Sequence, residues 1–392
     1  MQNKTFCVAP WVHMHIEPTG DVQLCCASNW KHDFNRSLGN LNNSTPLEIW
    51  NSDQYKHVRT SMIKGKMLDD YCSPCYLREN GAVNQTERQR LNSDFPVGYD
   101  LANQTKSDGS LDTIDIRYLD IRFNNLCNLK CRTCGPDWST SWANELGIEH
   151  PLHYNDAWKK IIPYLNNLEK VYFAGGEPMM ASEHYDFLEH LLDVNPNVEL
   201  LYTSNFTRLE LKDRHVMDYW PKFKLVNAVA SIDHISEYAA YVRTGSDYNQ
   251  VKRNVLHIKS QNLNNVRPAI TTVLSLYNIT KIGDIIVKFF NDGMLNNMNE
   301  IVFNLLVNPD YQSALIINDY GYELALENID TGITYLKANN HDTIKLDNIK
   351  LWLSNNREYD AVKFKKFVDY NRLLDTKRGT CFEELYYEYT KV

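Results

Sequence analysis

The sequence predicts an α/β protein in which an open or partial α/β barrel follows a small cysteine-rich module. From about residue 113, short β-rich runs alternate with longer amphipathic segments, a pattern typical of parallel strands joined by right-handed crossovers. Eight of the nine cysteines lie before residue 135. A stretch rich in Pro, Gly, Ser, Asn and Asp at residues 91–112 separates the two regions and is typical of a linker. With 392 residues, the chain is long enough for two to three domains.

Hydrophobic patterning assigns the elements in order. The β-rich runs expected as strands are 116–123, 171–174, 198–203, 225–231, 267–274 and 300–306. Expected helices are 183–193, 248–261, 280–292 and a final one at 357–376. We therefore predict a module at 1–90, a linker at 91–112, the barrel at 113–315 and a mostly helical extension at 316–392. Sites in such folds lie at the C-terminal ends of the strands.

Composition excludes several classes of function. The chain has 41 Lys and Arg against 49 Asp and Glu, a net charge of −8, which does not favour nucleic-acid binding. No apolar run approaches the roughly 18 residues of a membrane span. The N-terminus has no signal-peptide apolar region. We therefore expect a cytoplasmic protein without a membrane or nucleic-acid partner.

Three cysteines follow the first predicted strand of the barrel. Cys127, Cys131 and Cys134 are spaced C-x3-C-x2-C, so one loop can direct three thiolates at one centre. A [4Fe–4S] cluster takes four ligands, and three cysteines leave one iron open to a substrate or cofactor. The alternative is a zinc site, which in structural use takes four closed ligands.

Polar residues follow the next strands. Gly175, Gly176, Glu177 and Pro178 come after the second strand, where paired glycines allow a close backbone approach and Glu177 can accept a hydrogen bond from an amine. Ser204 and Asn205 end the third strand and can bind sugar hydroxyls, although both are ordinary turn residues. Further along lie Ser231, Asp233 and, on the next segment, Arg243, which can pair with a carboxylate or form an ion pair with Asp233. Together these groups suit an amino-acid nucleoside.

Residues 114–310 resemble the radical S-adenosylmethionine (SAM) superfamily, through CNLKCRTC, GGEP, TSN and SID followed by YVRTG. The resemblance implies a partial (β/α)6 barrel in which Cys127, Cys131 and Cys134 hold a [4Fe–4S] cluster. SAM would bind the open iron and be cleaved to a 5′-deoxyadenosyl radical that abstracts hydrogen from a substrate. The SAM contacts would be Gly175, Gly176, Glu177, Pro178, Ser204, Asn205, Ser231, Asp233 and Arg243. Thr133 stands where the family usually has an aromatic residue.

The N-terminal cysteines form a second group. Gly20 and Asp21 suit a hairpin turn, so Cys7 and Cys25 are expected on neighbouring strands, and Cys72 and Cys75 form a C-x2-C knuckle. Four thiolates of this kind also suit a structural zinc ion.

Nearly all of residues 6–80 resembles the SPASM/twitch module of radical SAM enzymes, through C-x2-PW, G-x4-C and the final C-x2-C. The resemblance implies a small α+β module that holds one auxiliary iron–sulfur cluster on Cys7, Cys25, Cys72 and Cys75. The module is expected here before the barrel, whereas it normally follows it.

The predicted function is therefore that of a radical SAM enzyme with two [4Fe–4S] clusters and SAM as cofactors. Expected partners are a peptide, protein or small-molecule substrate and an electron donor such as flavodoxin or ferredoxin. Peptide or protein modification is the first expectation, and oxidation of a small sugar or alcohol is the alternative. A zinc-stabilised binding protein is the non-enzymatic alternative. Three tryptophans are expected in the core of the module (Trp11, Trp30 and Trp50), and His234 is expected near the SAM pocket.

Overall fold

The computed structural model describes residues 5–28, 37–79, 86–149 and 156–390. Its residues group into two compact units. The first unit comprises Met1–Cys127, Glu149–Tyr202 and Glu210–Asn227, and the second comprises Asn128–Ile148, Thr203–Leu209 and Ala228–Val392. Trp30, which we expected in the core of the module, lies outside the described residues.

The N-terminal part of the first unit is a small α+β module. Its elements are α1 (Ala9–Val12), β1 (His13–Ile16), β2 (Asp21–Gln23), β3 (Gly39–Asn40), α2 (Pro46–Trp50), α3 (Asp53–Ile63) and α4 (Asp69–Glu79). The predicted turn at Gly20 exists, because β1 and β2 pair in antiparallel fashion and Gly20 adopts a positive φ of 83°. Trp11 and Trp50 are buried, as expected for core residues.

The predicted linker at 91–112 overlaps two helices. The second half of α5 (Glu87–Asp94) and all of α6 (Val97–Ala102) lie in residues that we expected to form a linker. Thr86 caps α5 in a reciprocal capping box with Gln89, and this Thr-x-x-Gln signature is readable in the sequence. Phe95, between the two helices, is buried and stacks on Tyr118. The turn-rich composition of residues 91–112 therefore concealed the end of a capped helix, α5, and a second short helix without a side-chain cap, α6.

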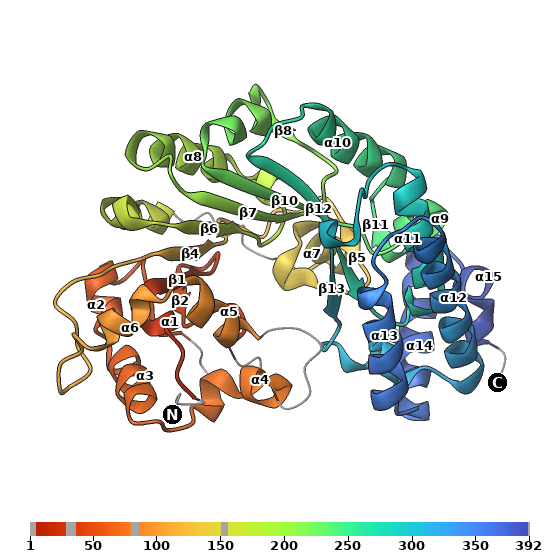
Figure 1. The fold of residues 1–392 in the computed structure, drawn as a ribbon, viewed down its shortest axis with the longest axis horizontal. Coiled ribbons are helices and arrows are strands. Elements are labelled where there is room, and N and C mark those ends of the chain that lie inside the picture. Colours follow the sequence, from red (N-terminus) through yellow and green to blue (C-terminus); the bar gives the residue numbers. More distant parts are fainter. Residues whose placement is uncertain (1–4, 29–36, 80–85, 150–155, 391–392) are drawn as a thin grey trace. The chain divides into compact units, whose positions relative to one another are not determined.

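The module contributes a strand to the parallel sheet of the first unit. β1 pairs in parallel with β4 (Tyr118–Ile121), with His13 opposite Tyr118 and Ile16 opposite Ile121. β4 then pairs in parallel with β6 (Lys170–Phe173), and β6 with β7 (Glu199–Ser204). Within this unit the strand order is β7-β6-β4-β1-β2-β3. Figure 1 shows β1 beside β4.

The crossovers of the first unit are helical. The 3-10 segment η2 (Asp156–Asn167) precedes β6, and α8 (Ser182–Val194) connects β6 to β7. Phe173 and Phe187 meet edge to face at 5.9 Å in the core between sheet and helix. A small hairpin of β8 (Glu210–Leu211) and β9 (Arg214–His215) precedes β10 (Leu225–Ser231), which begins in the first unit and ends in the second.

The second unit continues the α/β pattern. β12 (Val266–Leu274) pairs in parallel with β13 (Ile301–Leu305). Its other elements before the C-terminal segment are β5 (Lys130–Cys131), α7 (Thr140–Leu146), α9 (Ser236–Val242), β11 (Arg243–Thr244), α10 (Tyr248–Ser260) and α11 (Ile282–Asn291). All six predicted strands and the predicted helices exist within a few residues of the expected bounds, and the predicted α/β class with a small N-terminal module is confirmed.

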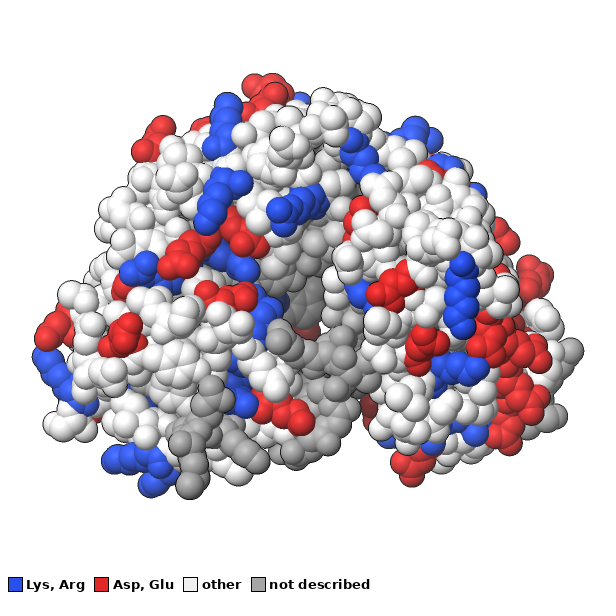
Figure 2. All heavy atoms as spheres, viewed as in Figure 1, with Lys and Arg blue, Asp and Glu red and all other residues white. Residues whose placement is uncertain are grey.

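The C-terminal segment is helical and packs within the second unit. It contains α12 (Asp319–Ala338), α13 (Ile344–Asn356), α14 (Ala361–Arg378) and α15 (Phe382–Leu385). α12 lies against α11 at Gly283, where a Cβ atom would come within 1.8 Å of the Asn328 carbonyl oxygen. Among the described helices, none is long and apolar enough to cross a membrane. Basic and acidic side chains are intermixed on the face shown in Figure 2.

Candidate cofactor site

The three-cysteine loop begins directly after β4 and passes through the short strand β5. Cys127 and Cys131 are half-buried, whereas Cys134 is exposed. Cys131 is opposite Arg243 in the antiparallel pair of β5 and β11. The amide of Arg132 donates to the Val242 carbonyl at 2.8 Å. β11 therefore holds the middle of the loop in the second unit.

In the first unit, the GGEP loop packs on the chain that leads to Cys127. The Glu177 amide donates to the Leu126 carbonyl at 2.7 Å. A Cβ atom on Gly176 would lie 2.4 Å from that carbonyl oxygen, closer than real contacts allow. Gly175 has a φ of +120°, which strongly favours glycine. The two glycines are thus required by backbone approach, as the sequence predicts.

The carboxylate of Glu177 is buried and caps a turn. Its Oε1 accepts from the Met179 amide at 3.2 Å, at the start of the 3-10 turn η3 (Pro178–Met180). Pro178 is buried as the first residue of that turn. Glu177 therefore stabilises the turn that follows the paired glycines.

Ser204 and Asn205 organise the loop after β7 in the second unit. Ser204 accepts from the Phe206 amide at 3.0 Å, and Asn205 accepts from the Thr207 amide at 2.9 Å. The Asn205 side chain also donates to the Asn128 side chain at 3.0 Å. Asn128 follows Cys127 in the sequence, so this loop is bonded to the start of the cysteine segment.

Asp233 and Arg243 form a buried ion pair. Arg243 Nε donates to Asp233 Oδ2 at 2.8 Å, and Asp233 Oδ1 accepts from the Val273 amide at 2.9 Å. Arg243 Nη1 lies 4.0 Å from Cys131 Sγ. Burial opposes the charge of Arg243, but Asp233 and Cys131 outweigh it, so its pKa is raised. This arrangement places a fixed positive charge beside a predicted cluster ligand.

Ser231 and His234 flank Asp233 and are both buried. His234 Nδ1 accepts from the Ile235 amide at 2.9 Å, and its ring stacks on Tyr238 with centroids 4.5 Å apart. Burial, with a smaller contribution from Lys281, lowers the pKa of His234 to about 3. The ring is therefore neutral at physiological pH.

The structure adds a site residue that sequence reasoning missed. Asn125 is fully buried two residues before Cys127, and neither polar atom of its side chain has a hydrogen-bond partner among the described residues. A Cβ atom on Gly176 would lie 2.7 Å from the Asn125 carbonyl carbon. A buried amide without partners is costly, so this position suits a polar ligand. No pattern in the sequence distinguishes Asn125 from Asn124.

The C-terminal helix α14 also holds the cysteine loop, which the sequence did not predict. Arg132 is fully buried and donates to Asp375 Oδ1 at 2.5 Å and to Asn371 Oδ1 at 2.8 Å. Arg378 donates to the Lys130 carbonyl at 3.0 Å and forms an ion pair with Glu145 at 2.7 Å. The backbone on both sides of Cys131 is thus bonded to residues more than 200 positions away.

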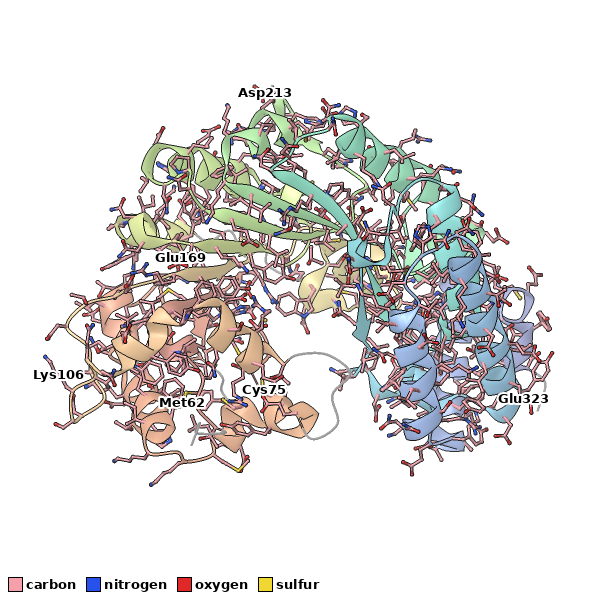
Figure 3. The ribbon with its side chains drawn as sticks, in the orientation of Figure 1. Met62, Cys75, Lys106, Glu169, Asp213 and Glu323 are labelled. Carbon is pink, nitrogen blue, oxygen red and sulfur yellow. The ribbon has the colours of Figure 1, made fainter. Side chains whose placement is uncertain are left out.

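The N-terminal cysteines lie on helices and loops rather than on strands. Cys7 precedes α1, because the Ala-Pro-Trp-Val segment after it is helical, so the expected placement of Cys7 on a strand is wrong. Cys25 follows β2. Cys72 and Cys75 lie one turn apart in α4, which replaces the expected knuckle, and Figure 3 labels Cys75 in this helix.

These thiols share one neighbourhood. Burial raises the pKa of Cys7 well above its usual value, and Cys72 and Cys75 raise it further. Burial, with help from Cys75, raises the pKa of Cys72 to about 12. Among the described residues, no three Cys, His, Asp or Glu side chains lie close enough together to hold a metal ion. Cys7, Cys25, Cys72 and Cys75 therefore raise one another's pKa values but do not lie around one point.

The donor chemistry fits iron–sulfur clusters. All nine cysteines are free thiols rather than disulfides. Thiolates are the usual protein ligands of such clusters, and ligand deprotonation accompanies metal binding. The partnerless Asn125 amide and the close glycine backbone lie beside the loop that leads to Cys127. The residues present are therefore compatible with a cluster and a polar cofactor.

Comparison with protein families decides between the iron–sulfur and zinc interpretations. A sequence model of the radical SAM superfamily matches residues 121–286, and a model of SPASM, an iron–sulfur cluster-binding domain, matches residues 7–76. The chain carries a radical SAM domain and an N-terminal SPASM domain. It is an enzyme, and its cofactors are [4Fe–4S] clusters and SAM.

Individual relatives are distant. The chain is 26% identical over 142 residues to GTP 3′,8-cyclase of Sulfurimonas denitrificans, and 25% identical over 186 residues to that of Campylobacter curvus. These matches cover 36% and 47% of this chain and 41% and 51% of the cyclases, so the chain spans about half or less of their length.

Solved structures include anSMEcpe with bound AdoMet, 19% identical with a TM-score of 0.42, covering 57% of this chain and 62% of that one. Streptococcus suis SuiB bound to the precursor peptide SuiA is 14% identical with a TM-score of 0.39, covering 84% and 69%.

Proposed function

We propose that this radical SAM enzyme abstracts hydrogen from a peptide or protein and that its SPASM module assists by electron transfer. The observation that carries the proposal is the joint occurrence of the two domains, with SPASM at residues 7–76 and radical SAM at 121–286. SPASM modules often accompany peptide or protein modification. Oxidation of a small sugar or alcohol is the second candidate for the same domain pair.

The proposed cofactor contacts come from short segments that are hydrogen-bonded to neighbouring parts of the chain. Cys127, Cys131 and Cys134 would hold the SAM cluster. The SAM contacts would be Gly175, Gly176, Glu177, Pro178, Ser204, Asn205, Ser231, Asp233 and Arg243. When bound, cluster and SAM supply a 5′-deoxyadenosyl radical that takes a hydrogen atom from the substrate.

The chain's own residues position and charge this site. Asp233 keeps Arg243 in one orientation through their 2.8 Å hydrogen bond. The guanidinium, 4.0 Å from Cys131 Sγ, stabilises negative charge on that sulfur. Glycine at 175 and 176 lets the backbone approach the chain before Cys127, and Glu177 presents a buried carboxylate for an ammonium group. His234 is neutral and is suited to hydrogen bonding rather than to proton donation.

The auxiliary cluster would be held by Cys7, Cys25, Cys72 and Cys75. In this position it would accept one electron from the substrate radical, so that the substrate undergoes net oxidation. The electrostatic coupling of Cys7 with Cys72 and Cys75 supports a common site for these thiols.

The test is anaerobic reconstitution with iron and sulfide, followed by SAM and dithionite. We expect brown protein that releases 5′-deoxyadenosine, and we expect Cys131→Ala to abolish the release. Cys381→Ala is the matched control, because Cys381 lies at the start of α15 and belongs to neither cysteine group. Unchanged product in Cys131→Ala would refute the assignment of the SAM cluster.

The substrate class is tested by deuterium transfer. Deuterated peptides, sugars and alcohols are incubated with the reconstituted enzyme, and deuterium is sought in 5′-deoxyadenosine. GTP is included because the curated relatives are GTP 3′,8-cyclases. Transfer from a peptide supports our proposal, whereas transfer only from a sugar, an alcohol or GTP would overturn the peptide assignment.

A further inference from the structure

Helix α14 has two chemically different faces. Its inner residues Phe364, Phe367, Asn371, Leu374 and Asp375 are buried in the second unit. Its outer face carries exposed apolar side chains, with Val362 80% and Leu373 62% exposed. Single exposed apolar side chains are common on protein surfaces, so these two matter only together with the charge and shape of the same face.

The outer face is also basic. The segment Ala361–Arg378 contains six Lys and Arg but only two Asp, in a chain with a net charge of −8. One of those two, Asp375, is buried against Arg132. The exposed basic residues of the helix are Lys365, Lys366, Arg372 and Lys377. Lys365 and Arg372 form ion pairs with Asp369 and Glu383, whereas Lys366 and Lys377 form no ion pair with the described residues.

A shallow hollow of about 630 Å³ opens on this face. Its lining includes the aromatic and aliphatic side chains of Tyr311, Val362, Tyr370 and Leu373 and the charged side chains of Lys365, Lys366 and Asp369. Lys366 lies over the Tyr311 ring, 4.5 Å from its centroid. The hollow therefore combines aromatic and aliphatic side chains with two ammonium groups and one carboxylate.

The floor of the hollow is bonded to the cysteine loop. Tyr370 donates from its hydroxyl to the Arg132 carbonyl at 3.0 Å, and Arg132 lies between Cys131 and Cys134 in the sequence. The same helix binds the Arg132 guanidinium and, through Arg378, the Lys130 carbonyl. A residue that lines the hollow, Tyr370, is thus hydrogen-bonded directly to the segment assigned to the cluster.

We propose that the outer face of α14, around Tyr370, is the docking surface for a small acidic electron-transfer protein. The inference rests on the proposed function, because it takes Cys127, Cys131 and Cys134 as the cluster ligands. One electron leaves the donor, which is oxidised, and one electron enters the cluster, which is reduced, and no atoms are exchanged. Redox partners form small, transient interfaces, and complementary charge speeds their encounter.

The test uses the holoenzyme, purified flavodoxin as the acidic probe, and the double variant Lys365→Glu/Lys366→Glu. Lys222→Glu/Lys224→Glu is the matched control, because both lysines are exposed and lie in the first unit. We expect the α14 variant to raise the Kd for flavodoxin at least tenfold at low salt and the control to leave it unchanged. Because the attraction is between exposed charges, wild-type binding should weaken as salt increases from about 50 to 300 mM.

Activity measured with two reductants distinguishes a loss of docking from a loss of folding. With dithionite, which needs no docking surface, the α14 variant should form 5′-deoxyadenosine at the wild-type rate. With flavodoxin and its reductase, its rate should fall at least fivefold. A second variant, Leu373→Ser, should weaken flavodoxin binding without a change in charge.

Two results would overturn the inference. One is flavodoxin binding that the α14 variants leave unchanged, and the other is an equal loss of activity with both reductants. Failure of the wild type to cleave SAM with dithionite would instead refute the proposed function, and the flavodoxin titration would still report on the surface.

Discussion

At the scale of single residues, a buried charge network joins the module to the first strand of the barrel domain. His15 Nδ1 lies 2.7 Å from Asp120 Oδ2, and His15 Nε2 lies 2.8 Å from Glu17 Oε1. Burial disfavours the charged forms of His15, Glu17 and Asp120. The attraction of Asp120 nevertheless raises the pKa of His15, and His15 with Arg122 lowers the pKa of Asp120 to about 2. The charged forms of His15 and Asp120 therefore stabilise each other.

This network predicts a pH-dependent stability difference between the wild type and Asp120→Asn. The depressed pKa of Asp120 gives stability that is present above pH 4 and is lost as pH falls toward 2. The raised pKa of His15 gives stability that is present below pH 6.5 and is lost as pH rises through its folded value. Denaturant unfolding from pH 3 to 9 should therefore show the largest difference near pH 5. Burial lowers the pKa of His13 to about 3 and Asp120 partly opposes that shift, so the substitution also acts on His13. A difference that is constant with pH would contradict the ionic assignment.

The glycines give a second prediction at this scale. In Gly176→Ala, the new methyl group would lie 2.4 Å from the Leu126 carbonyl oxygen, so the loop before Cys127 must move. We expect a loss of about 1–3 kcal/mol in the free energy of unfolding and at least tenfold weaker SAM binding. Gly135→Ala is the control, because nothing lies within 4 Å of its added Cβ atom. Equilibrium dialysis with labelled SAM and chemical denaturation measure both effects, and equal behaviour of the two variants would argue against a tight loop contact.

At the scale of elements, α14 acts as a brace for the cysteine loop. Arg378 stacks on Trp142, with 4.4 Å to the ring centroid, and bonds Glu145 and the Lys130 carbonyl. Trp142 in turn donates to the Cys131 carbonyl at 2.8 Å. The loop is thus held by side chains from two helices, α7 and α14, rather than by its own sequence.

We expect Arg378→Ala to destabilise the protein by about 1–3 kcal/mol, since it leaves the Lys130 carbonyl without this donor and Glu145 with only Lys130 as its ion-pair partner. The reconstituted variant should also lose iron to a chelator faster than the wild type. Arg372→Ala is the control on the same helix, because its ion pair with Glu383 is exposed and surface pairs contribute at most about 1 kcal/mol. Identical chelation rates for the two variants would show that α14 does not brace the loop.

The contacts of α14 also show which features could not be predicted from the sequence. The strands and the GGEP, TSN and SID segments could be predicted, because period-two apolar runs and strand-end turns are local signals. The bonds from Arg132 to Asn371 and Asp375 join residues 239 and 243 positions apart, and no local pattern carries such pairings. The helices at 87–102 were missed because turn-forming residues concealed a capping box, and Cys72 and Cys75 lie on a helix despite Pro74 between them.

At the scale of the whole molecule, the two cysteine groups should behave as separate cluster sites. We expect Cys72→Ala to remove about half the iron of the reconstituted enzyme, one cluster of two, while SAM cleavage by dithionite continues in part. Iron and sulfide analysis with electron paramagnetic resonance of the reduced protein measures this. Cys381→Ala should retain all of its iron. Full iron content in Cys72→Ala would show that the auxiliary assignment is wrong.

The parallel pairing of β1 with β4 has a consequence for biosynthesis. Residues 13–16 leave the ribosome about a hundred residues before their partners at 118–121, so the first strand is available as a template when the second emerges. A shortened protein that starts after the module would leave one edge of β4 with unpaired amide and carbonyl groups. Exposed strand edges promote association between chains. Expression of such a fragment should therefore yield aggregates rather than a smaller working enzyme.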